Sequence, residues 1–120
     1  MAWVIESYIS PSKAKKFENR HIREFRSLLV NLRIVNGMLD TRKSLNEILA
    51  TLPFLRSEGG GIYRIGQTFV ISAKESRLYV SFDFNRKKIL LLNIGIKETQ
   101  SRDLTESRKR LKTYISGENR

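Results

Sequence analysis

Apolar residues recur with two different periods along the chain, and the change of period divides the chain into a helical half and a strand-rich half. Residues 1–9 are rich in aromatic and β-branched residues and predict a short strand that ends at Ser10 and Pro11. From Ser12 onward apolar residues recur mostly every three or four positions, which predicts one long amphipathic helix that Gly37 ends or loosens. Its apolar stripe consists of Phe17, Phe25, Leu28, Leu29, Leu32, Val35 and Leu39.

A second, shorter helix follows, marked at both ends by residues with special backbone roles. Ser44 and Glu47 have the spacing of a capping box, in which the serine hydroxyl accepts from the Glu47 N–H and the glutamate reaches back. Pro53 ends this helix, and the glycines within residues 57–61 predict a loop. This loop precedes a strand and lacks the Lys-Ser/Thr pair of a phosphate-binding loop, so it is not one.

Beyond the glycines the apolar period changes to two, which is typical of strands. Residues 62–65 and 68–72 predict either one strand interrupted at Gly66 or two strands with a turn there. Residues 77–84 alternate, with Arg77 and Tyr79 on the face opposite the apolar residues. The unbroken apolar run at 89–96 indicates a central strand buried on both sides. We expect the three segments to form an antiparallel meander.

The pattern as a whole predicts a single α+β domain over residues 1–120. Asp103 and Glu106 form a second capping box that opens a last helix, with Leu104, Leu111 and Ile115 on its apolar face. The expected order is β-α-α-β-β-β-α: a small, mostly antiparallel sheet with an N-terminal helical pair and a C-terminal helix. We expect the helices to cover one face of the sheet and to leave the other face exposed.

Composition and charge narrow the function classes. The chain has no cysteine and one histidine, His21, which excludes disulfides, thiolate chemistry and a multi-histidine zinc site. A formal net charge of +11 on 120 residues points to a polyanionic partner, namely nucleic acid or a membrane surface, or to an acidic protein. The absence of a signal peptide and of a long apolar run predicts a cytoplasmic protein without a membrane span.

The exposed sheet face is the first candidate for a binding site. It combines tyrosines with cations, which suits RNA because rings stack on bases and guanidinium groups bind phosphate oxygens. The alternative is that strand lysines and arginines prevent edge pairing and that tyrosines fill the margin of the core. The residues in or beside this sheet are Tyr63, Arg64, Lys74, Arg77, Tyr79, Arg86, Lys87, Lys88 and Lys97.

Several passages of the strand-rich half and of the last helix resemble one family. Residues 61–66 (GIYRIG) resemble a glycine-led second strand, and residues 77–82 (RLYVSF) resemble an arginine-led third strand. Residues 89–100 resemble a last strand with a Lys-x-Thr-Gln exit, and residues 110–114 resemble the end of a C-terminal helix. Together they are similar to the RelE/ParE superfamily of bacterial toxins, and within it to the HigB-like, phage-associated branch.

The resemblance implies a ribosome-dependent mRNA endoribonuclease, an mRNA interferase, that is held inactive by an antitoxin. It implies catalysis by positioned cations and a tyrosine, with no metal and no cofactor. Arg77 matches the arginine that contacts the reacting phosphate, Lys97 the basic residue at the end of the last strand, and Arg64 the second-strand cation. The sheet pattern itself offers Tyr79 or Tyr63 to stack on a base. We expect further RNA contacts from Lys74, Arg86, Lys87 and Lys88.

Two departures from the family leave alternatives open. Ile96 stands where many HigB-like members have a histidine, so an imidazole acid or base is missing. The second strand also fits the family in a shifted register, in which Phe69 takes an arginine position and Arg77 loses its assignment. The rival functions are a ParE-like gyrase inhibitor and a non-catalytic RNA- or protein-binding module on the same fold.

Overall fold

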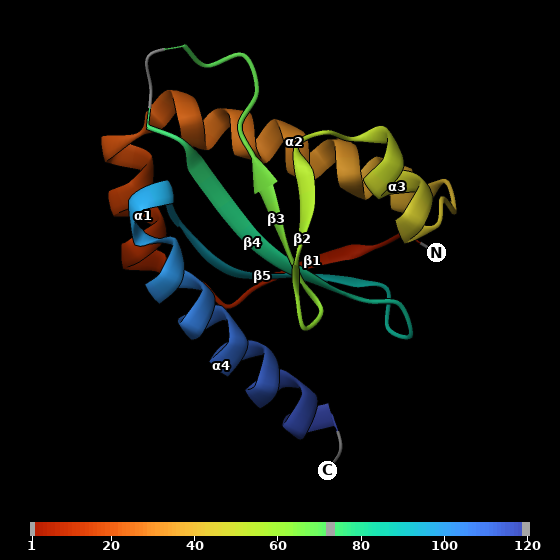
Figure 1. Ribbon diagram of the computed structural model, residues 1–120. Helices are drawn as coiled ribbons and strands as arrows, with labels where there is room; N and C mark the ends of the chain where they lie inside the picture. The colour runs from red at the N-terminus through yellow and green to blue at the C-terminus, as the bar shows by residue number, and fades with distance from the viewer. Residues whose placement is uncertain (1, 72–73, 119–120) are drawn as a thin grey trace.

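The computed structural model describes residues 2–71 and 74–118 and has an α+β architecture (Figure 1). Five strands form one sheet, and helices pack against it. In chain order the elements are β1 Val4–Ser7, α1 Pro11–Arg20, α2 Ile22–Asp40, α3 Leu45–Thr51, β2 Leu55–Gly59, β3 Ile62–Gly66, β4 Ser76–Asp83, β5 Lys88–Ile96, η1 Lys97–Thr99 and α4 Gln100–Glu118. Among the described residues, no helix has the length and apolarity needed to cross a bilayer.

The predicted long helix is two helices, and this corrects the sequence prediction. Ser10 caps α1 by accepting from the Lys13 N–H at 3.1 Å, with Pro11 in the first turn as expected. The helix breaks at His21, whose φ of −135° and ψ of 56° are not helical. The break allows α1 to pack against β5 while α2 crosses β3 and β4. Gly37 does not end α2, which continues to Asp40.

The strand order of the sheet is β1-β5-β4-β3-β2, and β1 is parallel to β5 while all other pairs are antiparallel. The predicted meander is therefore confirmed, and β2 is an additional strand in a segment whose second half was predicted as loop. The prediction of a strand at 68–72 is wrong for residues 68–71, and Ser72 lies outside the described residues. The Thr68 N–H instead donates a hydrogen bond to the Ser27 hydroxyl at 2.8 Å, which holds this segment against α2.

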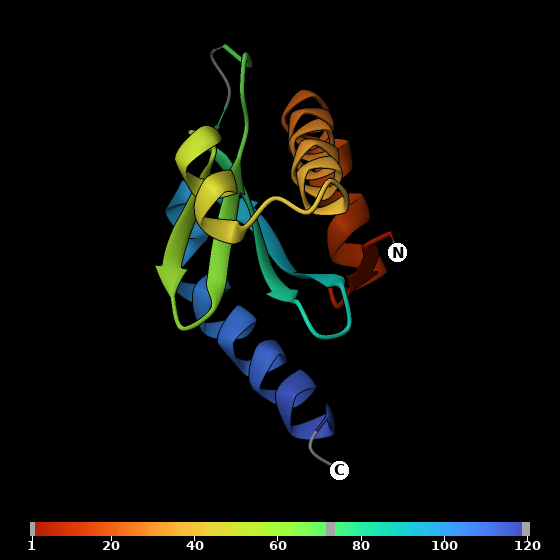
Figure 2. The ribbon, with the colours of Figure 1, turned by 90° about the vertical axis from the view of Figure 1, so that its right-hand side faces the viewer.

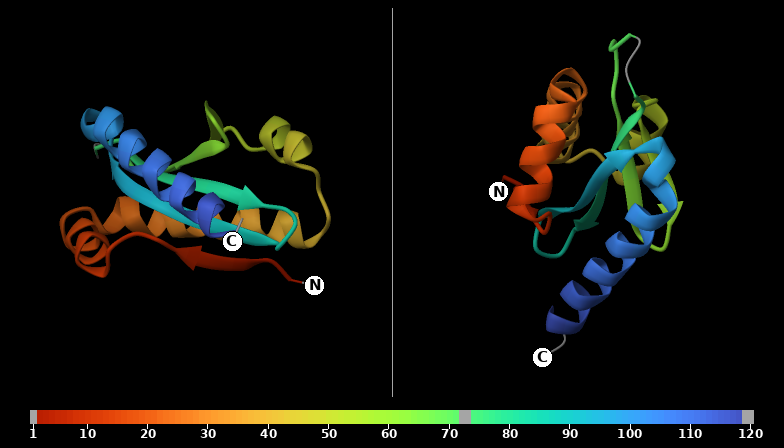
Figure 3. Two further views of the ribbon diagram at one scale, coloured as in Figure 1. Left: turned by 90° about the horizontal axis from the view of Figure 1, so that it is seen from below. Right: turned by 90° about the vertical axis from the view of Figure 1, so that its left-hand side faces the viewer.

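Helices cover both faces of the sheet, which overturns the expected one-faced layout (Figures 2 and 3). The α2 face buries residues such as Leu28, Ile65 and Val80 together with α1 and α3. The α4 face buries a second, smaller cluster. Its members are Ile62, Tyr79, Leu90, Leu92, Leu104 and Leu111. The central strand β5 contributes to both cores, which confirms that it is buried on both sides.

The last helix begins at Gln100, three residues before the predicted capping box. Asp103 is therefore not a cap but a fully buried helical residue beside β5. Its carboxylate accepts from the Thr99 hydroxyl at 2.6 Å and from the Lys13 ammonium at 3.3 Å. A β-carbon added to Gly95 would overlap this carboxylate, so the glycine is what lets α4 start close to the sheet.

Candidate functional site

Three arginines line a small cleft on the α4 face of the sheet, beside the start of α4. Arg56 of β2 lies directly opposite Arg64 of β3, and Arg77 of β4 lies opposite Gly66. Cross-strand partners and residues two apart share a face, so all three side chains are on one side. The cleft has a volume of 180 Å³, and we call it the arginine cleft. It is lined by Pro53, Phe54, Arg56, Arg64, Gly66, Gln67, Glu75, Ser76 and Arg77.

Lys97 is linked to the arginine cleft through Glu75. Glu75 Oε2 lies 3.6 Å from Arg77 Nη2 and 3.8 Å from Lys97 Nζ, so one carboxylate holds both cations. Arg64 Nε lies 3.1 Å from Glu58 Oε2, and its Nη1 donates to Gln100 of α4 at 3.4 Å. Arg56 makes no ion pair with any residue that the structure describes. Positive charge therefore exceeds negative charge at the cleft.

This excess of charge is costly for the sheet and favours an anionic ligand. Like charges directly opposite each other on paired strands are destabilising, and Arg56 and Arg64 are such a pair. The ion pairs with Glu58 and Glu75 are partly exposed, and such pairs contribute only about 0–1 kcal/mol each. A phosphate can replace a carboxylate at these guanidinium groups, because it offers the same two-oxygen geometry with more charge.

The structure corrects the role predicted for Tyr79. Its side chain is completely buried between the sheet and α4, so it cannot stack on a base. Among the described residues its hydroxyl has no hydrogen-bond partner. Burial raises the pKa of Tyr79 to about 12, and the nearby charge of Asp103 adds to this while Arg77 and Arg64 oppose it. Tyr79 is therefore a neutral phenol close to the cleft arginines, where α4 screens it from a ligand.

We predict that Tyr79 titrates well above the ordinary range of a tyrosine. Because its pKa is raised in the folded state, the free energy of unfolding is independent of this titration below pH 10 and falls as the pH rises towards about 12. An ultraviolet titration of tyrosinate should show a step near pH 12 that is missing in Tyr79→Phe. The same variant should be as stable as wild type or slightly more stable, because it removes a buried hydroxyl without a partner. A normal pKa or a large loss of stability would contradict this assignment.

The other predicted site residues do not gather at the cleft. Tyr63 lies on the α2 face, with its ring centroid 5.3 Å from that of Phe82, so its prediction as a base-stacking partner at this site is wrong. Lys74 is exposed and lies two residues before β4, where its ammonium is 3.6 Å from a carboxylate oxygen of Glu98. It flanks Glu75 at the rim of the cleft.

The β4–β5 turn carries the last group of predicted RNA contacts. Arg86, Lys87 and Lys88 lie at this turn, at the opposite end of β4 from Arg77. Lys88 forms an ion pair with Glu6 at 3.5 Å. These three residues lie too far along β4 to contact a phosphate held in the arginine cleft, and contact with a more distant part of an RNA strand stays a prediction.

The sequence patterns missed Arg56, Glu58 and Glu75. Arg56 and Glu58 belong to β2, which was hidden because Pro53 and the glycines on either side indicate a loop. The alternation of buried Leu55 with exposed Arg56 is the signal that was available. Glu75 precedes β4 and has no pattern of its own. Its role becomes visible only from its contacts with Arg77 and Lys97.

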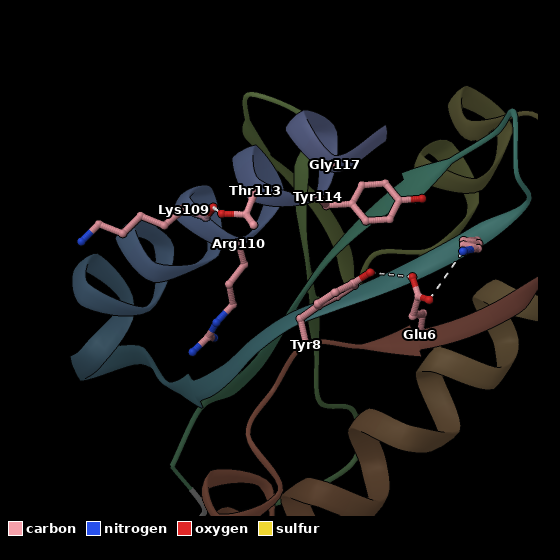
Figure 4. Close-up of a pocket in the computed structure, with 8 residues that line it drawn as sticks. Glu6, Tyr8, Lys109, Arg110, Thr113, Tyr114 and Gly117 are labelled. Carbon is pink, nitrogen blue, oxygen red and sulfur yellow. Dashed lines mark hydrogen bonds and ion pairs between the residues drawn. The ribbon is translucent and has the colours of Figure 1, made fainter. Parts of the chain in front are cut away.

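A wider cavity of 580 Å³ lies between β1 and the second half of α4 (Figure 4). Tyr8 and Tyr114 project into it, with ring centroids 5.9 Å apart. Most of its polar groups, Lys109 excepted, are engaged within the protein: the Tyr8 hydroxyl donates to Glu6 at 2.7 Å, and Arg110 donates to the Leu92 carbonyl at 2.6 Å. This cavity is therefore less suited to an anion than the arginine cleft.

Comparison with protein-family models, curated proteins and solved structures found no match to this chain. Its function therefore has to be inferred from its own residues. Across residues 2–71 and 74–118, His, Asp and Glu side chains form no group of three suited to a metal ion. The chemistry that the described geometry offers is the binding of a phosphate by fixed guanidinium and ammonium groups.

Proposed function

We propose that this chain is an endoribonuclease that holds the reacting phosphate of an RNA strand in the arginine cleft. The observation that carries the proposal is the convergence of Arg56, Arg64 and Arg77 on one cleft, with Lys97 held beside them by Glu75. The resemblance to RelE/ParE toxins extends it to a cytoplasmic mRNA interferase that acts on the ribosome and is inhibited by an antitoxin. Three of these four cations are the ones that the resemblance selected.

The proposed reaction is an internal transfer within the RNA. The 2′-oxygen of one nucleotide attacks the adjacent phosphorus, the bond to the 5′-oxygen of the next nucleotide breaks, and a 2′,3′-cyclic phosphate remains. Arg64 and Arg77 hold the non-bridging oxygens and stabilise the negative charge that grows on them. Glu75 accepts the proton of the 2′-hydroxyl, and Lys97 donates a proton to the leaving 5′-oxygen. Both groups then exchange protons with water.

Cleavage is tested on free RNA and on mRNA in translating ribosomes. We expect cleaved mRNA with 2′,3′-cyclic phosphate ends, and we expect any cleavage of free RNA to persist in EDTA because the cationic side chains supply the charge. The double variant Arg64→Gln/Arg77→Gln, purified in the same way, should be inactive in both settings. This control excludes a contaminating ribonuclease.

Three outcomes would overturn the proposal. One is intact RNA in both settings despite binding. Another is equal cleavage by the double variant. The third is inhibition of DNA supercoiling by gyrase with no cut in RNA, which would favour the ParE-like alternative.

A further inference from the structure

A third cavity, of 250 Å³, lies between α1, the end of β5 and the start of α4, next to the arginine cleft. Its floor includes Gly95, which is the direct cross-strand partner of Arg77. Neighbouring strands are about 4.8 Å apart, so this cavity begins roughly one strand away from the cleft. We call it the corner pocket. It is lined by Lys13, Lys16, Phe17, Arg20, His21, Ile94, Gly95, Ile96, Thr99, Arg102 and Asp103.

The corner pocket carries an excess of positive charge. Its one carboxylate, Asp103, is buried and already bound to Lys13 and Thr99. By contrast, Lys16, Arg20 and Arg102 are exposed and make no ion pair with any part of the chain that the structure describes. Glu106 of α4 is a further carboxylate whose charge acts on this group, through Arg102 and Lys13. Positive charge therefore still exceeds negative charge around the pocket.

Local structure holds these cations around the pocket. The break between α1 and α2 at His21 places Arg20 in the last turn of α1, and the His21 ring packs on Phe17 at 4.9 Å between centroids. On the opposite wall, Arg102 lies in the first turn of α4, whose position is set by Asp103 and Gly95. Lys13 Nζ joins the two walls because it bonds Asn93 Oδ1 at 2.6 Å and Asp103 Oδ1 at 3.3 Å.

We propose that the corner pocket binds the phosphate backbone of an RNA strand whose reacting phosphate lies in the arginine cleft. This inference rests on the proposed function for the identity of the strand. Lys97 and Arg102 lie on the short segment between the two cavities, so a backbone leaving the cleft passes two cations. The one acidic residue of that segment, Glu98, is paired with Lys74 at 3.6 Å. The exposed side chains of the pocket are the cations Lys16, Arg20 and Arg102, and the arginine cleft begins about one strand away. Positive charge that continues from one cavity to the next favours a nucleic acid backbone over an acidic protein segment.

The test compares two variants that each remove three positive charges. Lys16→Gln/Arg20→Gln/Arg102→Gln changes the corner pocket, and Arg26→Gln/Arg33→Gln/Lys43→Gln changes exposed residues of α2 and the turn after it. Binding is measured by fluorescence anisotropy with single-stranded RNAs of about three and about twelve nucleotides. The RNAs carry a 2′-deoxy substitution at every position that is cut.

We expect the pocket variant to bind the long RNA at least tenfold more weakly than wild type and the short RNA almost unchanged. The slope of log K against log salt for the long RNA should become shallower by about two, because each phosphate contact on a single strand contributes about 0.7. The α2 variant should change binding less than twofold. If both variants weakened the binding of the long RNA equally, the effect would come from the net charge of the protein alone, and the inference would be overturned.

Further outcomes separate this inference from the proposed function. If wild type fails to cut RNA but long-RNA binding still depends on the pocket, the proposed function fails and the inference stands. If wild type cuts RNA and the pocket variant binds the long RNA normally, the inference alone fails. A polyglutamate peptide is the third probe. Peptide binding that requires the pocket while RNA binding does not would assign the pocket to an acidic protein and overturn the inference.

Discussion

Replacing Arg77 with glutamine is expected to lower the rate of RNA cleavage by about a hundredfold, the usual loss when a fixed donor to a developing negative charge is removed. Arg77 is only 13% exposed and lines the cleft beside Glu75, so its guanidinium group is a fixed donor. Lys97 is 64% exposed and donates the proton to the leaving oxygen, so Lys97→Gln should also lower the rate, by about a hundredfold, the lower end for a general acid. Both rates are measured under single-turnover conditions with saturating RNA.

Arg86→Gln is the matched control, since it removes the same charge from the far end of β4. It should cleave RNA within twofold of wild type. The Arg77→Gln variant should keep the wild-type Tm to within a few degrees, because its ion pair with Glu75 is partly exposed and weak. Equal loss of activity in the two variants would show that Arg77 acts only through the net charge of the protein.

Gly95→Ala is expected to destabilise the protein by about 3 kcal/mol, at the upper end of the cost of overpacking a core. The added β-carbon would overlap the Asp103 carboxylate and would lie 2.9 Å from Thr99 Oγ1, so the start of α4 has to shift. For a domain of this size the loss corresponds to a decrease in Tm of roughly 10 °C. Chemical denaturation followed by circular dichroism measures it.

A double-mutant cycle isolates the cause of that destabilisation. In an Asp103→Ala background the carboxylate is absent, so Gly95→Ala should cost less than about 1 kcal/mol there. Gly37→Ala is the control for the change in residue type, because Gly37 is a helical glycine with no neighbouring atom within 4 Å of the added carbon. It should be neutral or stabilising. An undiminished cost of Gly95→Ala in the Asp103→Ala background would contradict the overlap argument.

Local sequence signals predicted most of the elements because they depend on neighbouring residues. Ser10 and Ser44 cap helices through bonds to backbone groups three residues away, and the structure has both bonds. The alternation at 77–84 and the apolar run at 89–96 likewise predicted β4 and β5. The apolar run at 89–96 also indicated that helices cover both faces of the sheet. The expectation that helices cover only one face was inconsistent with it.

Elements that depend on distant partners were misjudged. The helix break at His21 lets each helix pack on its own part of the sheet. As a result α1 packs against β5, and α2 packs against β3 and β4. The strand β2 exists because Leu55 and Arg56 pair with β3 across a glycine turn. The early start of α4 depends on the absence of a side chain at Gly95, whose effect appears only where the helix meets the strand.

The candidate site shows the same division. The chain by itself determined that Arg64 and Arg77 lie on strands and that Lys97 follows the last one, because strand periodicity is local. Only the tertiary structure decided that these three meet with Arg56, that α4 buries Tyr79, and that Tyr63 faces the other way. Register and helix placement decide which side chains share a face, and both are set by packing energies between segments far apart in sequence.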